Sequence, residues 1–314
     1  MATVTAVLAA TMPAARPVSV APSWPGDYPD PYVVRIDGTY WAYATQTTLG
    51  RVPAMRSTDL LVWQPAGDAM PALPSWAADA GAWAPAALVQ RNRVVLYSAL
   101  VVRNRQGASG IPLRCIAALV ATAPQGPFVD PSHGPIVCQP EHNGSIDPSV
   151  FVAPGGKPYL LWKSEGIPRR EPPYLWVQEL SADGLSVRGK PVALLRADRS
   201  WEYPVIENPA MTASGSRFFL FYSGNRWDST AYAIGYAVCA TVTGPCVKPA
   251  DNRLITSDGS AAGPGGLEVF TDTAGVRRLA YHAWTPGNVG YPAGQRSLRL
   301  RSLEFRAHGP VAID

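Results

Sequence analysis

One amino-acid pattern recurs five times along this 314-residue chain. In each unit, a residue followed by proline precedes a turn and then a strand rich in aromatic residues, as in GTYWAYAT, GKPYLLWKS and SRFFLFYSG. The five steps lie 54 to 63 residues apart, at Asp30, Ala84, Asp147, Asn208 and Gly263. A period of this size, with several strands per unit, is typical of β-propellers. The sequence therefore predicts an all-β, five-bladed β-propeller in a single domain, whereas a β-sandwich would lack the fivefold recurrence.

The composition agrees with this fold and excludes other classes of protein. The chain has 32 prolines, 28 glycines, 10 tryptophans and only 16% charged residues, which suits short strands joined by turns. Its net charge is +4 and its basic residues are scattered, unlike the clustered basic face of a nucleic-acid-binding protein. No apolar run approaches the roughly 20 residues of a transmembrane helix. We therefore expect neither a nucleic-acid nor a membrane partner. We also predict a monomer.

The first 22 residues differ from the rest. They are small, apolar and rich in alanine, with no charge before Arg16. They resemble the apolar part of a secretory signal that lacks a positively charged beginning. We predict a signal-like or disordered segment over residues 1–22 and the propeller over residues 23–314.

Four cysteines form two local pairs. Cys115 and Cys138 flank one strand-turn-strand segment, and Cys239 and Cys246 flank CATVTGPC. Both pairs are well placed for disulfides, although four buried thiols remain an alternative. Their spacing fits no zinc pattern. Disulfides indicate an oxidising compartment, so the predicted location is extracellular.

Three carboxylates fall at or beside the start of a predicted inner strand. In a propeller these starts converge at one end of the central axis, so Asp30 and Asp147 should face one cavity. Glu207 stands one residue before the Asn208 step, and Glu202, five residues earlier, is its rival. Carboxylates across a cleft can divide the roles of acid and base, and a third can raise the acid's pKa. Hydrolysis of a glycosidic bond needs such a set.

Aromatic side chains near the same rim are candidates for stacking on sugar rings. Trp83 precedes the second step and Trp201 precedes the fourth. For each tryptophan, packing inside or between blades is the alternative interpretation.

The segments YPDPYVV, SIDPSVF and VIENPAM, each followed by its aromatic strand, resemble glycoside hydrolase family 43. The resemblance runs from about residue 26 to residue 305. It implies a five-bladed propeller that cleaves arabinose- and xylose-containing polysaccharides with inversion. It also implies that Asp30 is the general base, that Asp147 tunes the pKa of the proton donor, and that Glu207 is the general acid.

The resemblance has further implications, and the sequence departs from the family pattern at two positions. His282 matches a histidine that helps to hold a calcium or other ion in the central channel through water, although Gly266 stands where many relatives carry a second histidine. Arg296 resembles an arginine that reaches the substrate. Asn208 replaces the usual Gly or Ala between the acid and proline, and we expect it to contact the acid or the substrate. The chemistry itself should require no cofactor.

These expectations combine into one predicted function. We expect a secreted, inverting glycoside hydrolase that acts on plant cell-wall polysaccharide or oligosaccharide. The segments 101–115 and 165–177 are long enough to wall off one side of the site, which favours an exo-acting α-L-arabinofuranosidase. Endo-arabinanase, β-xylosidase and a non-catalytic carbohydrate-binding propeller are the alternatives. Because the acids occupy only some blades, a single catalytic centre is favoured over one binding site per blade.

Overall fold

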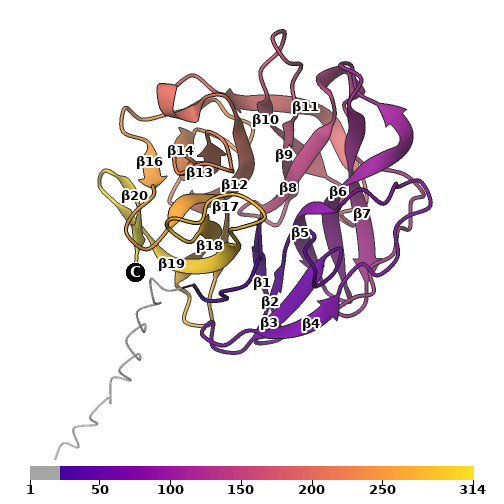
Figure 1. Cartoon of the computed structure of the whole chain (residues 1–314), viewed down its shortest axis with the longest axis horizontal. Coiled ribbons are helices and arrows are strands. Elements are labelled where there is room, and N and C mark those ends of the chain that lie inside the picture. Colours follow the sequence, from indigo (N-terminus) through magenta and orange to yellow (C-terminus); the bar gives the residue numbers. More distant parts are fainter. Residues whose placement is uncertain (1–21) are drawn as a thin grey trace, which may run out of the picture.

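The computed structural model describes residues 22–314, which form five antiparallel sheets around a central axis (Figure 1). Within each sheet the strands follow chain order from the axis outwards, apart from one short outer strand of the fourth sheet, so each sheet is one blade. This arrangement confirms the predicted five-bladed, all-β, single-domain propeller. The predicted signal-like segment falls almost entirely outside the described residues.

The blades contain twenty strands and are listed here in chain order. Blade one has β1 (Tyr32–Ile36), β2 (Thr39–Tyr43), β3 (Pro53–Ser57) and β4 (Gln64–Asp68). Blade two has β5 (Trp83–Gln90), β6 (Arg93–Gln106) and β7 (Pro112–Ala121). Blade three has β8 (Ser145–Val152), β9 (Pro158–Ser164), β10 (Tyr174–Leu180) and β11 (Val187–Arg196). Blade four has β12 (Ile206–Ser214), β13 (Arg217–Gly224), β14 (Ala233–Cys239), β15 (Cys246–Val247) and β16 (Arg253–Ile255). Blade five has β17 (Ala262–Thr271), β18 (Arg277–Trp284), β19 (Arg296–Arg306) and β20 (Gly309–Ile313). Two short 3-10 turns, η1 (Pro140–His142) and η2 (Ser200–Glu202), precede blades three and four.

Four inner strands carry a β-bulge at the same place. In β5 the pairing of Trp83 with Ala99 is followed by that of Ala86 with Tyr97, so two residues are skipped. The same shift occurs in β8, β12 and β17. The first skipped residue has a positive φ in every case, and Asp30 before β1 has it too; these residues are Asp30 (51°), Ala84 (43°), Asp147 (54°), Asn208 (49°) and Gly266 (62°). Bulges of this kind re-aim side chains, here toward the axis.

The bulge corrects the predicted repeat in blade five. Strand β17 has two such shifts, which skip Gly263 and Gly266, and Gly266 is the one that lies with Asp30 and Asp147 at the axis, three residues beyond the predicted Gly263. Gly263 has a positive φ as well, but a Cβ there would meet the Ser229 carbonyl oxygen, away from the axis. In the segment GPGG both Gly263 and Gly266 adopt a positive φ, which glycine tolerates. Proline follows Gly263, which does not face the axis, and not Gly266, which does. The prediction of Gly263 as the blade-five step was therefore wrong.

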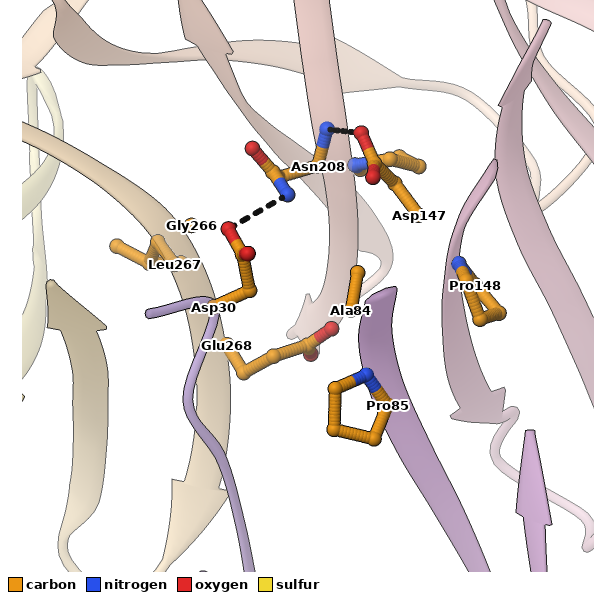
Figure 2. A pocket seen from close by; sticks show the side chains of 10 residues that line it. Asp30, Ala84, Pro85, Asp147, Pro148, Asn208, Gly266, Leu267 and Glu268 are labelled. Carbon is orange, nitrogen blue, oxygen red and sulfur yellow. Dashed lines mark hydrogen bonds between the residues drawn. The ribbon is translucent and has the colours of Figure 1, made fainter. Parts of the chain in front are cut away.

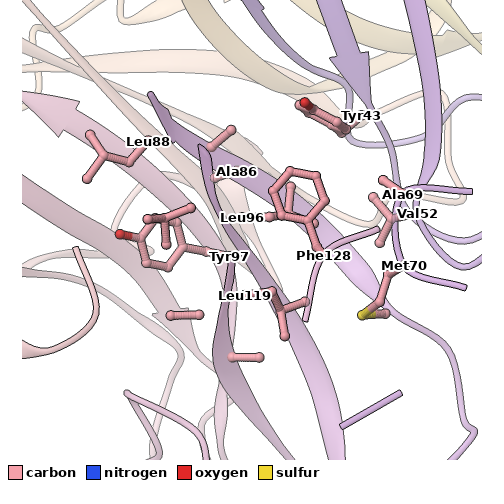
Figure 3. Packing of buried hydrophobic residues seen from close by; sticks show 14 of the residues in the cluster. Tyr43, Val52, Ala69, Met70, Ala86, Leu88, Leu96, Tyr97, Leu119 and Phe128 are labelled. Carbon is pink, nitrogen blue, oxygen red and sulfur yellow. The ribbon is translucent and has the colours of Figure 1, made fainter. Parts of the chain in front are cut away.

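The core lies between neighbouring blades. In Figure 3, Tyr43 of blade one and Phe128 face the aliphatic side chains of blade two, with their rings edge to face at 6.1 Å. Burying one such side chain stabilises the fold by about 1.5–3 kcal/mol. These contacts fix the blades against each other, and so fix the spacing of the residues at the axis.

The beginning of the described chain joins the ring to the last blade. The backbone N–H groups of Ser23 and Tyr28 donate to carbonyl oxygens of Leu298 and Arg296 on β19, each at 2.8 Å. The buried Tyr28 hydroxyl donates to the Pro53 carbonyl in blade one. This closure brings Asp30, two residues after Tyr28, next to the side chain of Arg296.

Both predicted disulfides are present, Cys115–Cys138 and Cys239–Cys246. Within residues 22–314, no helix has the length and apolar character needed to cross a membrane.

Candidate active site

A cavity of about 560 Å³ opens at the end of the axis where the inner strands begin. Six of the predicted site residues line it, namely Asp30, Trp83, Asp147, Glu207, Asn208 and Arg296. Figure 2 shows the base of this region, where Asp30, Asp147 and Asn208 point toward one another from three different blades. The bulges described above supply this convergence, because residues in ordinary β conformation would alternate between the two faces of their blades.

Asp30 is held by donors on both carboxylate oxygens. The Thr45 hydroxyl accepts the Ala84 N–H at 2.7 Å, so its single proton is directed to Asp30 Oδ2, also at 2.7 Å. The Asn208 side-chain amide donates to Oδ1 at 3.5 Å, and the Arg296 guanidinium lies 3.8 Å from Oδ2. These donors stabilise a carboxylate at this position and orient it toward the cavity.

Asp147 occupies a more buried position than Asp30. Its Oδ2 accepts the backbone N–H of Asn208 at 3.1 Å. Burial, followed by the nearby charge of Glu207, raises the pKa of the Asp147 carboxyl well above its ordinary value, against the opposing effect of Lys163. Asp147 therefore keeps a proton to higher pH than a free aspartate does.

Glu207 lies at the cavity wall with 13% of its side chain exposed. The Lys163 ammonium donates to Oε2 at 3.1 Å, and the Tyr232 hydroxyl lies 2.7 Å from Oε1. Lys163 is buried on β9 and also contacts Glu165 at 3.1 Å. The acid is thus positioned from blades three and four together.

Glu202, the rival for the third acid, is fully buried and does not line the cavity. Its carboxylate accepts the backbone N–H groups of Asp198 and Arg199, the Lys248 ammonium at 2.7 Å and the Tyr222 hydroxyl at 2.6 Å. Four fixed donors hold this carboxylate, so this residue holds η2 in place. The structure places Glu207, and not Glu202, at the cavity.

The two predicted sugar platforms differ in position. Trp83 is 38% exposed at the cavity, with the Arg114 guanidinium 3.2 Å from its ring centroid on one face. Burial lowers the pKa of Arg114 to about 10. Trp201 instead packs on Tyr222 at 5.9 Å, and its indole N–H donates to Asn252 beneath the blade surface. Its position does not support the predicted role in sugar binding, because no face of the ring borders the cavity.

Arg296 joins the base to an aromatic wall. Its guanidinium lies 4.8 Å from the ring centroid of Trp227 and 5.5 Å from that of Tyr291, while approaching Asp30 on the other side. Trp227 is 39% exposed and Tyr291 is 47% exposed, so both present surface to a ligand.

Sequence reasoning missed several residues of the site: Thr45, Lys163, Trp227, Tyr232 and Tyr291. Of these residues, only Lys163 could have been identified from the sequence. It is a charged residue in the middle of an apolar strand sequence, and a buried lysine needs a carboxylate partner.

The predicted walls of the cavity were largely wrong. Residues 101–115 form a hairpin in which β6 runs on to Gln106 and β7 begins at Pro112, and none of it except the supporting Arg114 approaches the cavity. Of segment 165–177, only Glu165 borders the cavity. The wall is formed instead by the loop 225–228 and by Tyr291.

His282 does not fit direct binding of an ion. Its Nδ1 accepts the Asp30 backbone N–H at 3.0 Å, so the proton of the neutral ring sits on Nε2, which is then a donor. Burial and the charge of Arg296 lower the pKa of His282 to about 3. A Cβ at Gly266 would approach this imidazole at 2.6 Å, so a second histidine there would displace it. Among residues 22–314, no group of three or more His, Cys, Asp or Glu side chains could hold a metal. An ion held through water remains a prediction.

Comparisons with known proteins agree with this architecture. The family model "Glycosyl hydrolases family 43" matches residues 20–311. A thermostable family-43 glycoside hydrolase superposes with a TM-score of 0.81 at 24% identity, covering 91% of this chain and 92% of that one. An endo-1,4-beta-xylanase from Bacteroides thetaiotaomicron gives 0.77 at 26% identity, covering 94% and 97%. An alpha-L-arabinofuranosidase from Lactobacillus brevis gives 0.74 at 21% identity, covering 93% and 94%. No curated protein matches the chain.

Fold, cavity and family model together define a propeller glycosidase. The chain belongs to glycosyl hydrolases family 43, as the sequence predicted, and it is a glycoside hydrolase.

Proposed function

We propose that this enzyme hydrolyses arabinose- or xylose-containing glycosides with inversion, and that it acts as an exo-acting α-L-arabinofuranosidase. The observation that carries the proposal is the convergence of Asp30, Asp147 and Glu207 on one cavity in three different environments. Family membership supports the reaction class, and the named activities of the similar structures support the choice of sugars.

Asp30 and Glu207 take the two opposite proton-transfer roles. Asp30 takes a proton from water as the water oxygen bonds to the anomeric carbon from one face of the sugar. Glu207 gives a proton to the leaving oxygen as the bond between that oxygen and the anomeric carbon breaks on the opposite face. The product sugar then carries the inverted anomeric configuration, and the enzyme returns to its starting state by proton exchange with solvent.

Asp147 and Arg296 support this reaction without taking part in the bond changes. Asp147 lies beside Glu207 and, through Asn208, fixes the backbone that carries the acid. Arg296 lies against Asp30 and Trp227, where it can donate to sugar hydroxyl groups while the aromatic faces cover the ring carbons.

The size of the cavity supports exo action. A volume of about 560 Å³ suits a ligand of a few sugar rings rather than a long polymer groove. The wall formed by Trp227 and Tyr291 closes one side in place of the segments that the sequence suggested. The two disulfides support action in an oxidising, extracellular compartment, where plant cell-wall polysaccharide is the expected substrate.

A small panel of substrates tests the proposal. Nitrophenyl α-L-arabinofuranoside, nitrophenyl β-xyloside, linear arabinan and arabinoxylan are incubated with the enzyme, and products are separated by size. Proton NMR of the first product reports its anomeric configuration. Release of arabinose alone, in the inverted form, is the expected result. Xylose release or long oligosaccharides would replace the arabinofuranosidase with a β-xylosidase or an endo-acting enzyme, and retention would overturn the mechanism.

A further inference from the structure

Two neutral side chains connect the proposed acid to the proposed base. The Tyr232 hydroxyl lies 2.7 Å from Glu207 Oε1 and 2.8 Å from Asn208 Oδ1. The other end of the same amide, Asn208 Nδ2, donates to Asp30 Oδ1 at 3.5 Å, as Figure 2 shows. Tyr232 is 1% exposed, so water does not compete for its hydroxyl.

The number of protons in this chain fixes its direction. A carboxylate at Asp30 requires the amino group of the Asn208 amide to face it, since the opposite orientation would place two acceptors together. The amide oxygen then faces Tyr232 and takes its one hydroxyl proton. Glu207 Oε1, at hydrogen-bond distance from the same hydroxyl, must therefore supply a proton rather than accept one. In this direction of the hydrogen bonds, an ionised Asp30 goes together with a protonated Glu207.

We propose that Tyr232 and Asn208 form a directional hydrogen-bond bridge that stabilises Glu207 as the neutral acid while Asp30 is the carboxylate. The bridge rests on the proposed function only in the roles given to its two ends. Tyr232 and Asn208 are positioning residues here, because they act on the reaction through Glu207 and Asp30.

The surrounding charges oppose the bridge at one end and support it at the other. The Lys163 ammonium on β9 lies 3.1 Å from the Glu207 carboxyl group and attracts a negative charge there, while Asp147 on β8 lies beside it. Glu165 shares the charge of Lys163 and weakens its effect on Glu207. Without the bridge, Lys163 would therefore have greater influence over the proton of Glu207.

Beside Asp30, Arg296 on β19 favours the carboxylate at 3.8 Å. His282 on β18 faces the same residue in its neutral form, with Nδ1 accepting the Asp30 N–H. At the Asp30 end, the surrounding charges and the bridge therefore favour the same proton arrangement, a carboxylate.

One residue that differs from the family pattern makes this bridge possible. Asn208 stands where the resemblance led us to expect Gly or Ala, and neither of those residues could contact Tyr232 or Asp30 by a side-chain amide. The positive φ of Asn208, 49°, is one that asparagine tolerates better than most residues, so the bulge and the bridge use the same side chain.

Carbon-13 NMR of carboxyl-labelled enzyme measures the titration of Glu207, whose signal is assigned by its loss in Glu207→Gln. Tyr232→Phe removes the acceptor for the Glu207 proton, and Asn208→Ala frees the Tyr232 proton to donate to Glu207. In both variants we expect the titration midpoint of Glu207 to fall by about 0.5 to 1 pH unit. Tyr236→Phe is the matched control, because it removes a tyrosine hydroxyl on β14 that faces Gly309 of β20, and it should leave the midpoint unchanged.

A bridge of the opposite direction gives a different result. If Tyr232 donated to an ionised Glu207, its loss would raise the midpoint, and Asn208→Ala would leave it unmoved; either outcome overturns the proposal. The alkaline limb of kcat/KM on the phenyl glycoside of the preferred sugar should move with the NMR midpoint. The midpoint of Glu207 could fall in both variants although the wild-type enzyme cleaves no glycoside of the panel. That result would support the bridge and refute the proposed function.

Discussion

Glu202 and Glu207 are five residues apart, yet their surroundings differ in every respect that matters for catalysis. Glu202 is fully buried, accepts four hydrogen bonds and has no path to the cavity. Glu207 reaches the cavity and contacts one lysine and one tyrosine hydroxyl. A carboxylate whose acceptors are all satisfied by fixed donors stabilises a loop, whereas one with an open side can exchange a proton with a substrate.

The comparison also shows why the backbone at the bulge matters. Glu202 sits in a 3-10 turn, whose side chain points into the blade. Glu207 precedes Asn208, where the positive φ turns the chain toward the axis. Residues such as Asn208 and Asp147 hold a conformation that costs on the order of 1–3 kcal/mol, and such conformations cluster at functional sites.

The largest effect on activity is expected for Asp30→Asn. Loss of a general base lowers the rate by about 10² to 10⁴-fold, while the amide still accepts from Thr45 and so keeps the fold. Steady-state kinetics with the preferred substrate, beside a thermal unfolding curve, measures both quantities. Retention of more than a tenth of wild-type kcat would remove Asp30 from the role of base.

Glu202→Gln should lower the stability of the fold and leave the activity almost unchanged, the reverse of Asp30→Asn. It leaves the buried Lys248 with Asp198 as its remaining carboxylate partner, 2.9 Å away. We expect a loss of about 2–4 kcal/mol in the free energy of unfolding, measured in urea. Folded enzyme should keep kcat within a few-fold of wild type. A stable but inactive Glu202→Gln variant would reverse the assignment of the two glutamates.

Trp83→Ala and Trp201→Ala extend the comparison to the aromatic residues. Trp83→Ala removes a surface of the cavity, so KM should rise about tenfold with little change in stability. Trp201→Ala opens a cavity beside Tyr222 and should cost about 3–5 kcal/mol of unfolding free energy, with KM unchanged. Kinetics and urea unfolding of both variants check this, and an unchanged KM in Trp83→Ala would remove Trp83 from the binding site.

Asp147→Asn should make the fold more stable while it impairs catalysis. Because the pKa of Asp147 is raised in the folded state, the folded protein binds this proton more tightly than the unfolded chain does. The wild-type contribution is therefore present at pH values below the unfolded pKa and is lost as the pH rises through the folded pKa. The asparagine of the variant does not titrate, so its free energy of unfolding does not fall in this way. The difference in unfolding free energy between variant and wild type should therefore be small near pH 4 and grow toward neutral pH. Urea unfolding across that range tests the sign, and an advantage that shrinks with rising pH would contradict it.

The sequence predicted the blades and the three acids because both depend on local pattern. In four blades proline follows the residue of positive φ at the axis, and Asp30 and Asp147 are two of these residues. The axis-facing position of blade five was predicted at the wrong residue because in GPGG the proline follows Gly263, which points away from the axis. Lys163 approaches Glu207 from β9 of the neighbouring blade, and Tyr232 approaches it from beside β14 of the same blade. Both contacts depend on how strands that are far apart in the sequence pack together. No local pattern records that distance.

The same limit applies to the tryptophans. Trp83 and Trp201 both precede a blade step, and their sequences do not differ in any way that foretells burial. Gly224 and Gly235 make the difference, since their lack of side chains leaves the space that Trp201 fills. That space becomes visible only once β13 and β14 are paired.

The role of Glu207 as general acid is the central claim, and its dependence on the leaving group tests it most directly. Wild type and Glu207→Gln are compared on a series of aryl glycosides of the preferred sugar, from phenyl to dinitrophenyl leaving groups. A good leaving group needs no proton, so the variant should lose about 10² to 10⁴-fold in kcat/KM on the phenyl glycoside and little on the dinitrophenyl glycoside. An equal loss across the series, or full activity on the phenyl glycoside, would contradict the assignment of Glu207.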